Sequence, residues 1–370
     1  MRVAVIGCGA MGAATGWRLA ARGAEVVCFD RYSPPHSFGS SHGETRITRT
    51  AYFEGPWYVP LLQETFPLWR ELESASGAQV LTLTGLLMIG APDSGSVAGS
   101  TAVAKQHGLV IESLDADEIR RRFPGHVVND AEVGVFDPQA GYLRAEAAVE
   151  AMSRDLDLRR HVTVDRIVSK PDGVEVITSE GNHSFDACVV AAGPWVRDLL
   201  PGLPVTIERQ VLVWLSVESG AGWLAPDRFP VWYHEDPRHG DIYGFPSLDG
   251  RSLKLARHHG GELTAPDSVR RQVDDADVDP LRWFATQCLR GVTRHVARSA
   301  VCMYTNTPDQ DFIVDLLPDD PRIVVLSPCS GHGFKFAPVI GDIAADLVCD
   351  GGTSRDISRF SLARFEGPAA

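Results

Sequence analysis

The sequence of 370 residues has few basic residues and no long apolar run. Its 35 lysines and arginines are outnumbered by 48 aspartates and glutamates, the net charge is −13, and no basic cluster occurs. Because nucleic acids are bound through clustered lysines and arginines, this composition argues against a nucleic-acid partner. No apolar stretch reaches the roughly 18 residues that would span a bilayer, and residue 1 leads directly into a strand pattern without a secretory leader. We therefore expect a cytoplasmic protein with no membrane partner.

Cysteine is also scarce, and its spacing follows no disulfide framework. The seven cysteines are an odd number, which is typical of free thiols in a reducing compartment. They occupy positions 8, 28, 188, 288, 302, 329 and 349. Because the sequence has no Cys-x-x-Cys pair, it predicts no zinc site, and we expect no metal.

Residues 2–30 have the order of a dinucleotide-binding βαβ unit. An apolar strand leads into a Gly-x-Gly-x-x-Gly turn and a helix, and a second strand ends on Asp30. Gly7 allows the tight turn, Gly9 lets the backbone approach a pyrophosphate, and Gly12 lets the helix pack closely on the sheet. The helix N-terminus would then face the phosphates, and Asp30 would accept the ribose hydroxyls. The pattern itself does not separate NAD from FAD.

Two later segments extend this unit. Residues 162–195 read as a small β-meander that returns to a buried strand ending in Ala-Ala-Gly, a pattern found in many FAD-binding Rossmann proteins. Residues 323–326 form a third buried strand, followed by the glycine-rich loop SPCSGHGFKF and a helix over 338–348. These pieces predict one nucleotide domain assembled from distant parts of the chain.

The remaining segments predict a different architecture. Residues 207–217 and 228–258 contain short apolar runs interrupted by turn residues, a pattern that is typical of antiparallel strands and hairpins. Residues 268–297 have the pattern of an amphipathic helix. A chain of this length is also longer than one core usually grows. We therefore expect an α/β protein, α+β overall, with a Rossmann-type FAD-binding domain and a second, antiparallel-sheet substrate domain. The predicted FAD-binding domain comprises 1–80, 150–200 and 300–370, and the substrate domain comprises 80–150 and 200–300.

Several polar residues have both a functional and an ordinary interpretation. Arg46 and Arg49 are three residues apart, so in a helical turn they would share one face, or they are a solvated pair. Lys254 lies in a strand pattern, where alternation separates it from Leu253 and Leu255 and would ordinarily expose it to solvent. Cys302 follows a β-branched residue, where a cysteine is most often a small apolar filler of the core.

Four motifs bear on these choices. The sequence resembles the family of monomeric sarcosine oxidase and N-methyltryptophan oxidase over essentially the whole chain. The shared motifs, in the same order, are GSSHGETRITR at 39–49, YGFPS at 243–247, VCMYT at 301–305 and SGHGFKF at 330–336. Four motifs in register are far more specific than any one of them.

The resemblance implies roles for individual residues. Cys302 would anchor FAD covalently through a thioether to the methyl carbon at C8 of the flavin. Arg49 and Lys335 would bind the substrate carboxylate as a guanidinium fork and a point charge. Arg46 would lie near the flavin, and Lys254 would activate dioxygen by stabilising developing negative charge.

Further positions follow from the same motifs. His258 keeps the register of an active-site histidine, and Tyr304 and Tyr243 would line the cavity. Arg257 departs from the family, which commonly has an aromatic residue there, and the roles of Cys329 and His332 stay open. The residues expected to bind the cofactor are Gly7, Gly9, Gly12, Asp30, Ser40, Arg46, Cys302, Gly331, Gly333 and Lys335.

The function implied by the resemblance is FAD-dependent oxidation of a secondary amino acid, N-methylated or cyclic. A hydride would pass from the carbon next to nitrogen to flavin N5, giving an imine, and dioxygen would be reduced to hydrogen peroxide. The expected partners are a small amino acid and dioxygen, and the protein is expected to be a monomer. Three alternatives stay open: a flavin dehydrogenase with another acceptor, a biosynthetic amine oxidase with a larger substrate, and a nucleotide-binding protein without turnover.

Overall fold

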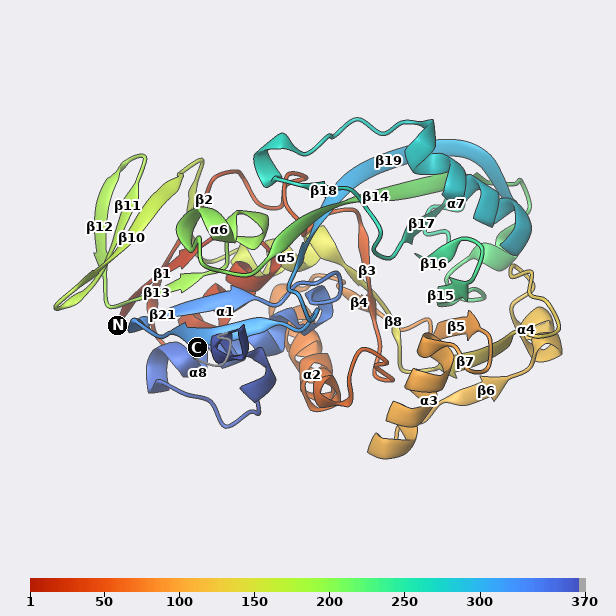
Figure 1. Cartoon of the computed structure of the whole chain (residues 1–370), viewed down its shortest axis with the longest axis horizontal. Coiled ribbons are helices and arrows are strands. Elements are labelled where there is room, and N and C mark those ends of the chain that lie inside the picture. The colour runs from red at the N-terminus through yellow and green to blue at the C-terminus, as the bar shows by residue number, and fades with distance from the viewer. Residues whose placement is uncertain (366–370) are drawn as a thin grey trace.

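A six-stranded sheet forms the dinucleotide-binding half of the computed structural model, which describes residues 1–365 (Figure 1). Its strands, in spatial order, are β20 (Ile313–Leu317), β21 (Asp320–Ser327), β13 (Ala187–Val190), β1 (Arg2–Ile6), β2 (Glu25–Asp30) and β9 (Asp157–Arg160). All neighbouring pairs are parallel except β20 and β21. Short apolar runs such as that of β1 suit a sheet that is covered on both faces. The nucleotide domain predicted from separate parts of the chain is therefore built around one sheet.

The two faces of this sheet are covered differently. Val3 and Val5 of β1 pack in a core with helices α1 (Ala10–Ala21), α2 (Val59–Ser76), α5 (Ala145–Ser153) and α8 (Ala337–Asp350). Ala4 and Ile6 point to the other face, toward the predicted meander and the short helix α6 (Val196–Leu199). The meander is a three-stranded antiparallel sheet of β10 (Val164–Lys170), β11 (Gly173–Thr178) and β12 (Gly181–Phe185). Strand alternation thus assigns successive side chains of β1 to two separate cores.

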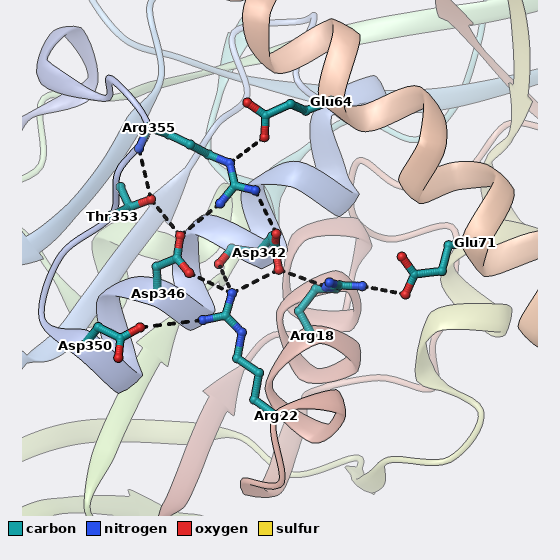
Figure 2. A network of polar contacts seen from close by, with 9 residues as sticks. All are labelled: Arg18, Arg22, Glu64, Glu71, Asp342, Asp346, Asp350, Thr353 and Arg355. Atoms are coloured by element: carbon teal, nitrogen blue, oxygen red, sulfur yellow. Dashed lines mark hydrogen bonds and ion pairs between the residues drawn. The ribbon is translucent and has the colours of Figure 1, made fainter.

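Helices α1 and α8 are joined by a network of ion pairs (Figure 2). Asp342 accepts from Arg18 Nε at 3.0 Å, from Arg22 Nη2 at 3.1 Å and from Arg355 Nη2 at 2.8 Å. Asp346 pairs with Arg22 and Arg355 at 2.7 and 2.9 Å. The network connects the first helix of the chain to its last one, and so holds the cofactor-binding turn against the C-terminal segment.

The second half of the molecule is a nine-stranded sheet that lies to the right in Figure 1. Its connected order is β18 (Leu263–Thr264), β14 (Thr206–Val217), β17 (Ser252–Arg257), β16 (Gly240–Gly244), β15 (Val231–Asp236), β5 (Leu86–Gly90), β7 (Val133–Asp137) and β6 (Glu112–Leu114). The long strand β19 (Val292–Asn306) also pairs with β14. The sheet is antiparallel, as predicted, except for the parallel pair β15 and β5. Helices α3 (Gly95–His107), α4 (Ala116–Arg122) and α7 (Asp275–Cys288) belong to this half.

The helix predicted over 268–297 is wrong at both ends. Helix α7 begins after Asp274, whose carboxylate forms a capping box with Asp277, and it ends at Cys288. Gly291 then takes a left-handed φ of +79°, and the chain enters β19 one residue later. The amphipathic pattern predicted the existence of the helix correctly. The residues of the following turn and strand have the same pattern by chance, so the predicted helix was too long.

A small antiparallel sheet lies between the two halves. It contains β3 (Thr45–Thr48), β8 (Gly141–Arg144) and β4 (Leu81–Thr82). Arg46 and Arg49 therefore do not share a helical face: Arg46 is in β3 and Arg49 follows it. The predicted domain boundaries stay a prediction, and β19 crosses the one placed at residue 300. Among residues 1–365, no helix is both long enough and apolar enough to cross a membrane.

Candidate active site

One large cavity lies where the two halves meet. Its wall begins at the turn after β1 and the end of β2, continues along the loops that follow β13 and β21, and includes side chains of β15, β16 and β19. The carboxyl ends of parallel strands are the usual ligand-binding edge of such a sheet. The cavity therefore extends from a dinucleotide-binding edge to the face of the second sheet.

The dinucleotide end has the close backbone packing that its glycines allow. Gly7 has a left-handed φ of +86°, and a Cβ there would lie 2.5 Å from Ala191 O. A Cβ at Gly12 would lie 1.8 Å from Gly7 O, so only glycine lets α1 begin this close to β1. Gly9 caps α1 without a side-chain hydrogen bond and lines the cavity. The first turn of the helix thus faces the cavity, where the N–H of Ala10 donates to Ser41 Oγ at 3.0 Å.

Asp30 lies beside this turn with its carboxylate in the cavity wall. It accepts hydrogen bonds from the backbone N–H groups of Cys8 and Tyr32, both at 2.8 Å. These bonds fix the carboxylate, which has lone pairs left for a ribose hydroxyl. The glycine turn, the helix start that faces the cavity and the acid together fit the adenosine half of FAD.

Cys302, Arg46 and Ser40 form a group in the middle of the cavity wall. Cys302 Sγ lies 3.7 Å from both Arg46 Nη2 and Ser40 O. Arg46 is held by carbonyls, with Nη2 donating to Ser40 O at 2.7 Å and to His42 O at 2.6 Å, and Ser40 Oγ donates to Met303 O at 2.7 Å. The guanidinium is therefore fixed beside a thiol that lines the cavity.

Another cysteine lines the same cavity. Cys329 comes from the loop after β21, next to Gly331 and Gly333, which also line the cavity. Burial raises the pKa of its thiol to about 11, so it is protonated near neutral pH. All seven cysteines are free, as the sequence predicted.

Arg49 and Lys335 bring two cationic side chains to the far end of the cavity. Arg49 forms an ion pair with Glu54 and stacks over the rings of Tyr52 and Phe53, with its guanidinium carbon 4.4 and 4.2 Å from their centroids. Glu54 Oε2 is buried and has no hydrogen-bond partner among the described residues. The carboxylate of Glu54 thus occupies one side of the guanidinium fork.

Lys335 is oriented by a chain of hydrogen bonds. Its Nζ donates to His332 O at 2.8 Å and to Tyr52 Oη at 3.2 Å. His332 Nε2 lies 3.0 Å from Gln310 O, which can only accept, so Nε2 carries the proton and Nδ1 accepts from Tyr52 Oη at 2.7 Å. Burial, reinforced by the charge of Lys335, lowers the pKa of His332 to about 3. His332 is therefore a neutral group that fixes Tyr52 and, through it, Lys335.

The charge of Lys335 itself is reduced by its surroundings. Burial, followed by the nearby charge of Arg49, lowers the pKa of its ammonium to about 7. An anion between the two cations would favour the protonated lysine. Arg49 and Lys335 therefore offer positive charge to a carboxylate, in competition with Glu54 on one side of the guanidinium.

Tyr243, Tyr304, Tyr233 and His258 form the aromatic wall on the second sheet. His258 Nδ1 lies 3.4 Å from Tyr304 Oη. Burial lowers the pKa of His258 well below its usual value and raises the pKa of each of the three tyrosines, so all four groups are neutral near pH 7. The wall is polar but uncharged.

Lys254 is buried, unlike a surface lysine, but it does not reach the wall of the large cavity. Its Nζ donates to Gly43 O at 2.5 Å and to Thr45 O at 2.8 Å. It lines a much smaller cavity next to Trp214 and Phe245 instead. Burial, assisted by the charge of Arg46, lowers the pKa of its ammonium well below the usual value. The role in oxygen activation stays a prediction.

The sequence did not point to Glu54, Tyr52 or Tyr233. Tyr52 and Glu54 lie shortly after Arg49 in the segment TRTAYFEG. The residues that follow the arginine motif were therefore a signal that could have identified both. Tyr233 had no local signal, because a tyrosine in an apolar strand is more often core.

Comparisons with known proteins show which family the chain matches. Residues 2–347 match the family model "FAD dependent oxidoreductase". The chain is 40% identical to monomeric sarcosine oxidase of Streptomyces avermitilis, covering all of this chain and 98% of that protein. It is 38% identical to N-methyl-L-tryptophan oxidase of Yersinia pestis, covering 98% of each. Among solved structures, NikD, described as an unusual amino acid oxidase essential for nikkomycin biosynthesis, aligns with a TM-score of 0.86 and 26% identity, over 97% of this chain and 96% of that one.

Proposed function

Because the chain belongs to the FAD-dependent oxidoreductase family that includes monomeric sarcosine oxidase and N-methyl-L-tryptophan oxidase, we propose that it oxidises a secondary α-amino acid at the carbon next to nitrogen. It is an enzyme that acts on CH–NH donors with FAD. The proposal for the substrate rests above all on one observation: Arg49 and Lys335 line the same cavity as the dinucleotide turn. FAD, when bound, supplies the hydride acceptor of the reaction.

The residues of the cavity would place the substrate rather than react with it. Arg49 and Lys335 would bind the carboxylate, and the neutral wall of His258 and the tyrosines would face the amine and its substituent. A protonated ammonium has no lone pair to drive hydride departure. The nearby guanidinium of Arg46 and the uncharged wall both disfavour an added positive charge, so the substrate amine would be bound neutral.

We further propose that Cys302 is the covalent anchor of FAD. The support is its position: Cys302 lines the same cavity as the dinucleotide turn, and the fixed guanidinium of Arg46 lies 3.7 Å from its Sγ. A cysteine thiol is the nucleophile that such a bond requires. The cytoplasmic location and the monomeric state expected from the sequence stay predictions.

The test is a panel of N-methyl and cyclic amino acids, each compared with its parent primary amine and with its N-methyl amide lacking the free carboxylate. We expect turnover only with secondary amines that keep the carboxylate, measured as flavin bleaching without oxygen. If amides are oxidised as fast as acids, the carboxylate end of the cavity has been misassigned.

A second candidate is a dehydrogenase that passes electrons to an acceptor other than oxygen. The position of Lys254 favours it, because the ammonium is bound by the carbonyls of Gly43 and Thr45 and lies outside the large cavity. Mixing the reduced enzyme with oxygenated buffer distinguishes the two. An oxidase would be reoxidised within its turnover time with one equivalent of hydrogen peroxide, whereas a dehydrogenase would stay reduced until an artificial acceptor is added.

A further inference from the structure

A second group of ligand-type side chains lies in the nine-stranded sheet, outside the large cavity. His234 and Asp236 are on β15, and Glu132 immediately precedes β7, which is separated from β15 by β5. Each offers one nitrogen or oxygen atom, and the three atoms lie within 4.8 Å of one another. All three residues are buried, with at most 8% of their surface exposed. Buried acids in such a group need a cation or donors to balance their charge. Glu132 has Asn129 N and His234 Nε2 as partners, each at 2.8 Å, and Asp236 has Arg238.

A fourth side chain points into this group without a hydrogen-bond partner. His239, in the turn between β15 and β16, places Nδ1 3.2 Å from Asp236 Oδ1, and its side chain is only 5% exposed. Neither of its ring nitrogens has a hydrogen-bond partner among residues 1–365, and the same holds for Nδ1 of His234. Buried imidazole nitrogens are rarely left unpaired, because losing their contact with water is unfavourable. These nitrogens are therefore available to a ligand.

We propose that Glu132, His234, Asp236 and His239 bind one Zn²⁺ ion. Zinc takes imidazole nitrogens and carboxylate oxygens at about 2.0–2.2 Å, and in a tetrahedral site this sets neighbouring ligand atoms about 3.3 Å apart. One edge already has nearly this length, 3.2 Å from Asp236 Oδ1 to His239 Nδ1. Glu132 Oε1 and His234 Nε2 lie 2.8 Å apart in a hydrogen bond that the ion would have to replace. Two histidines with two carboxylates suit zinc better than the all-oxygen sites of calcium or magnesium. Four protein ligands make the site structural rather than catalytic.

One cation already touches the group and would compete with the ion. Arg238 Nη2 lies 2.7 Å from Asp236 Oδ2, and the arginine side chain is 58% exposed. Arg238 also donates to Asp236 Oδ1, from Nε at 3.2 Å and from its backbone N at 2.7 Å, so the ion would have to displace the guanidinium from this carboxylate. The charge of Arg238 would weaken metal binding without excluding it.

The proposed zinc site lies behind β15, a strand that contributes to the wall of the large cavity. Tyr233 precedes His234 on β15 and lines the large cavity, whereas His234 points to the other face of the strand, against Phe284 of α7. An ion bound behind β15 would connect this strand to the segment before β7 and to the β15–β16 turn. It would thus fix the strand that carries one part of the aromatic wall.

This inference reverses the expectation of no metal. That expectation used cysteine pairs close in sequence, whereas these ligands come from positions about 100 residues apart and meet only in the folded sheet. His-x-Asp is too short and common a pattern to indicate a site.

The test uses the flavin-containing protein, treated with a chelator and returned to metal-free buffer. Calorimetric titration with ZnCl₂ should show one saturable site per chain, and Co²⁺ in its place should give the intense visible absorption of a tetrahedral site. The chelated protein should also unfold at a lower temperature than the zinc-loaded one. No saturable binding, or Co²⁺ spectra of an octahedral aqua ion, would overturn the proposal.

Variants identify the ligands. Glu132→Gln and Asp236→Asn keep the shape of each side chain and should each weaken Zn²⁺ binding by at least about 10–100-fold. Arg238→Gln should strengthen it, because the competing charge is removed. The matched control is His295→Gln, an exposed histidine on β19, which should leave binding unchanged. If His295→Gln abolishes the signal, or if both amide variants bind as the wild type does, the zinc is held elsewhere and the proposal is wrong.

Discussion

The affinity of the enzyme for a carboxylate should depend on pH through Lys335. Burial and the nearby charge of Arg49 lower the pKa of this ammonium to about 7, so in the free protein it loses its proton above that pH. A bound carboxylate lies between the two cations and stabilises the protonated form. Binding above pH 7 must therefore take up a proton, and the affinity falls as pH rises.

The size of the effect follows from this linkage. Each pH unit between the pKa of the free protein and that of the complex lowers the affinity tenfold, or by about 1.4 kcal/mol. Because Lys335 is already half deprotonated at pH 7, the dissociation constant of a simple carboxylate should rise about 50-fold from pH 7 to pH 9, or by about 2.3 kcal/mol. Below pH 7 the affinity should level off, because Lys335 is already charged. His258 does not contribute in this window, since burial keeps its pKa well below the usual value.

The assay is a titration with acetate, which has no amine of its own, followed by the change in the flavin absorption spectrum from pH 6 to 9.5. Calorimetry in two buffers of different ionisation enthalpy should give an uptake of nearly one proton at pH 8. Lys335→Met should lower the affinity at pH 6.5 and remove the pH dependence. Lys254→Met is the control, because that lysine lies outside the large cavity and should leave the slope intact. A flat profile in the wild type, or a slope that disappears in Lys254→Met instead, would refute the assignment of Lys335.

Three further outcomes are expected. Lys254→Met should leave flavin reduction by substrate within a few-fold of wild type but slow reoxidation by oxygen about 100-fold in stopped-flow measurements, and equal loss in both steps would contradict a role in oxygen activation. Cys302→Ala should release its flavin on acid precipitation whereas Cys329→Ala retains it, as read from the colour of the pellet and the mass of the Cys302 peptide; flavin released by the wild type would contradict the covalent bond. Asp342→Asn should lower the free energy of unfolding, measured in denaturant titrations, by about 2–3 kcal/mol, because three arginines lose a common partner. The control Glu71→Gln removes a half-exposed ion pair with Arg18 and should change this free energy by less than about 1 kcal/mol. Similar losses in the two variants would argue against the network.

The local parts of the fold could be predicted because their signals are local. The turn from Gly7 to Gly12, the strand that ends on Asp30 and the meander after residue 162 are each defined by residues close in sequence, and the structure has all three. The four motifs then indicated one protein family for the whole chain, and the comparisons confirm that family.

What could not be predicted depends on packing between distant segments. The spacing of Arg46 and Arg49 could not show that Arg46 lies in a strand. Strand β3 is only four residues long, and it pairs with β8, which lies about 100 residues later in the chain. Strand alternation correctly separated Lys254 from Leu253, but both faces of β17 are buried, so the polar face is not the solvent face. Glu132 and His239 have no local signal either, since the zinc group proposed for them forms only when β7 and β15 enter the same sheet.

The strands β14 and β19 explain how one cavity can use both halves of the molecule. They are the longest strands of the described structure, pair along most of their length, and lead from the nine-stranded sheet toward the dinucleotide half (Figure 1). Cys302 and Tyr304 are on the same face of β19, two residues apart, so one strand presents the proposed flavin anchor and a tyrosine of the substrate wall to the same cavity. The distance between the anchor and the wall is thereby fixed by the strand itself. A one-residue slip of β19 against β14 would turn both side chains away together, which is why the site depends on the register of this pair more than on any single loop.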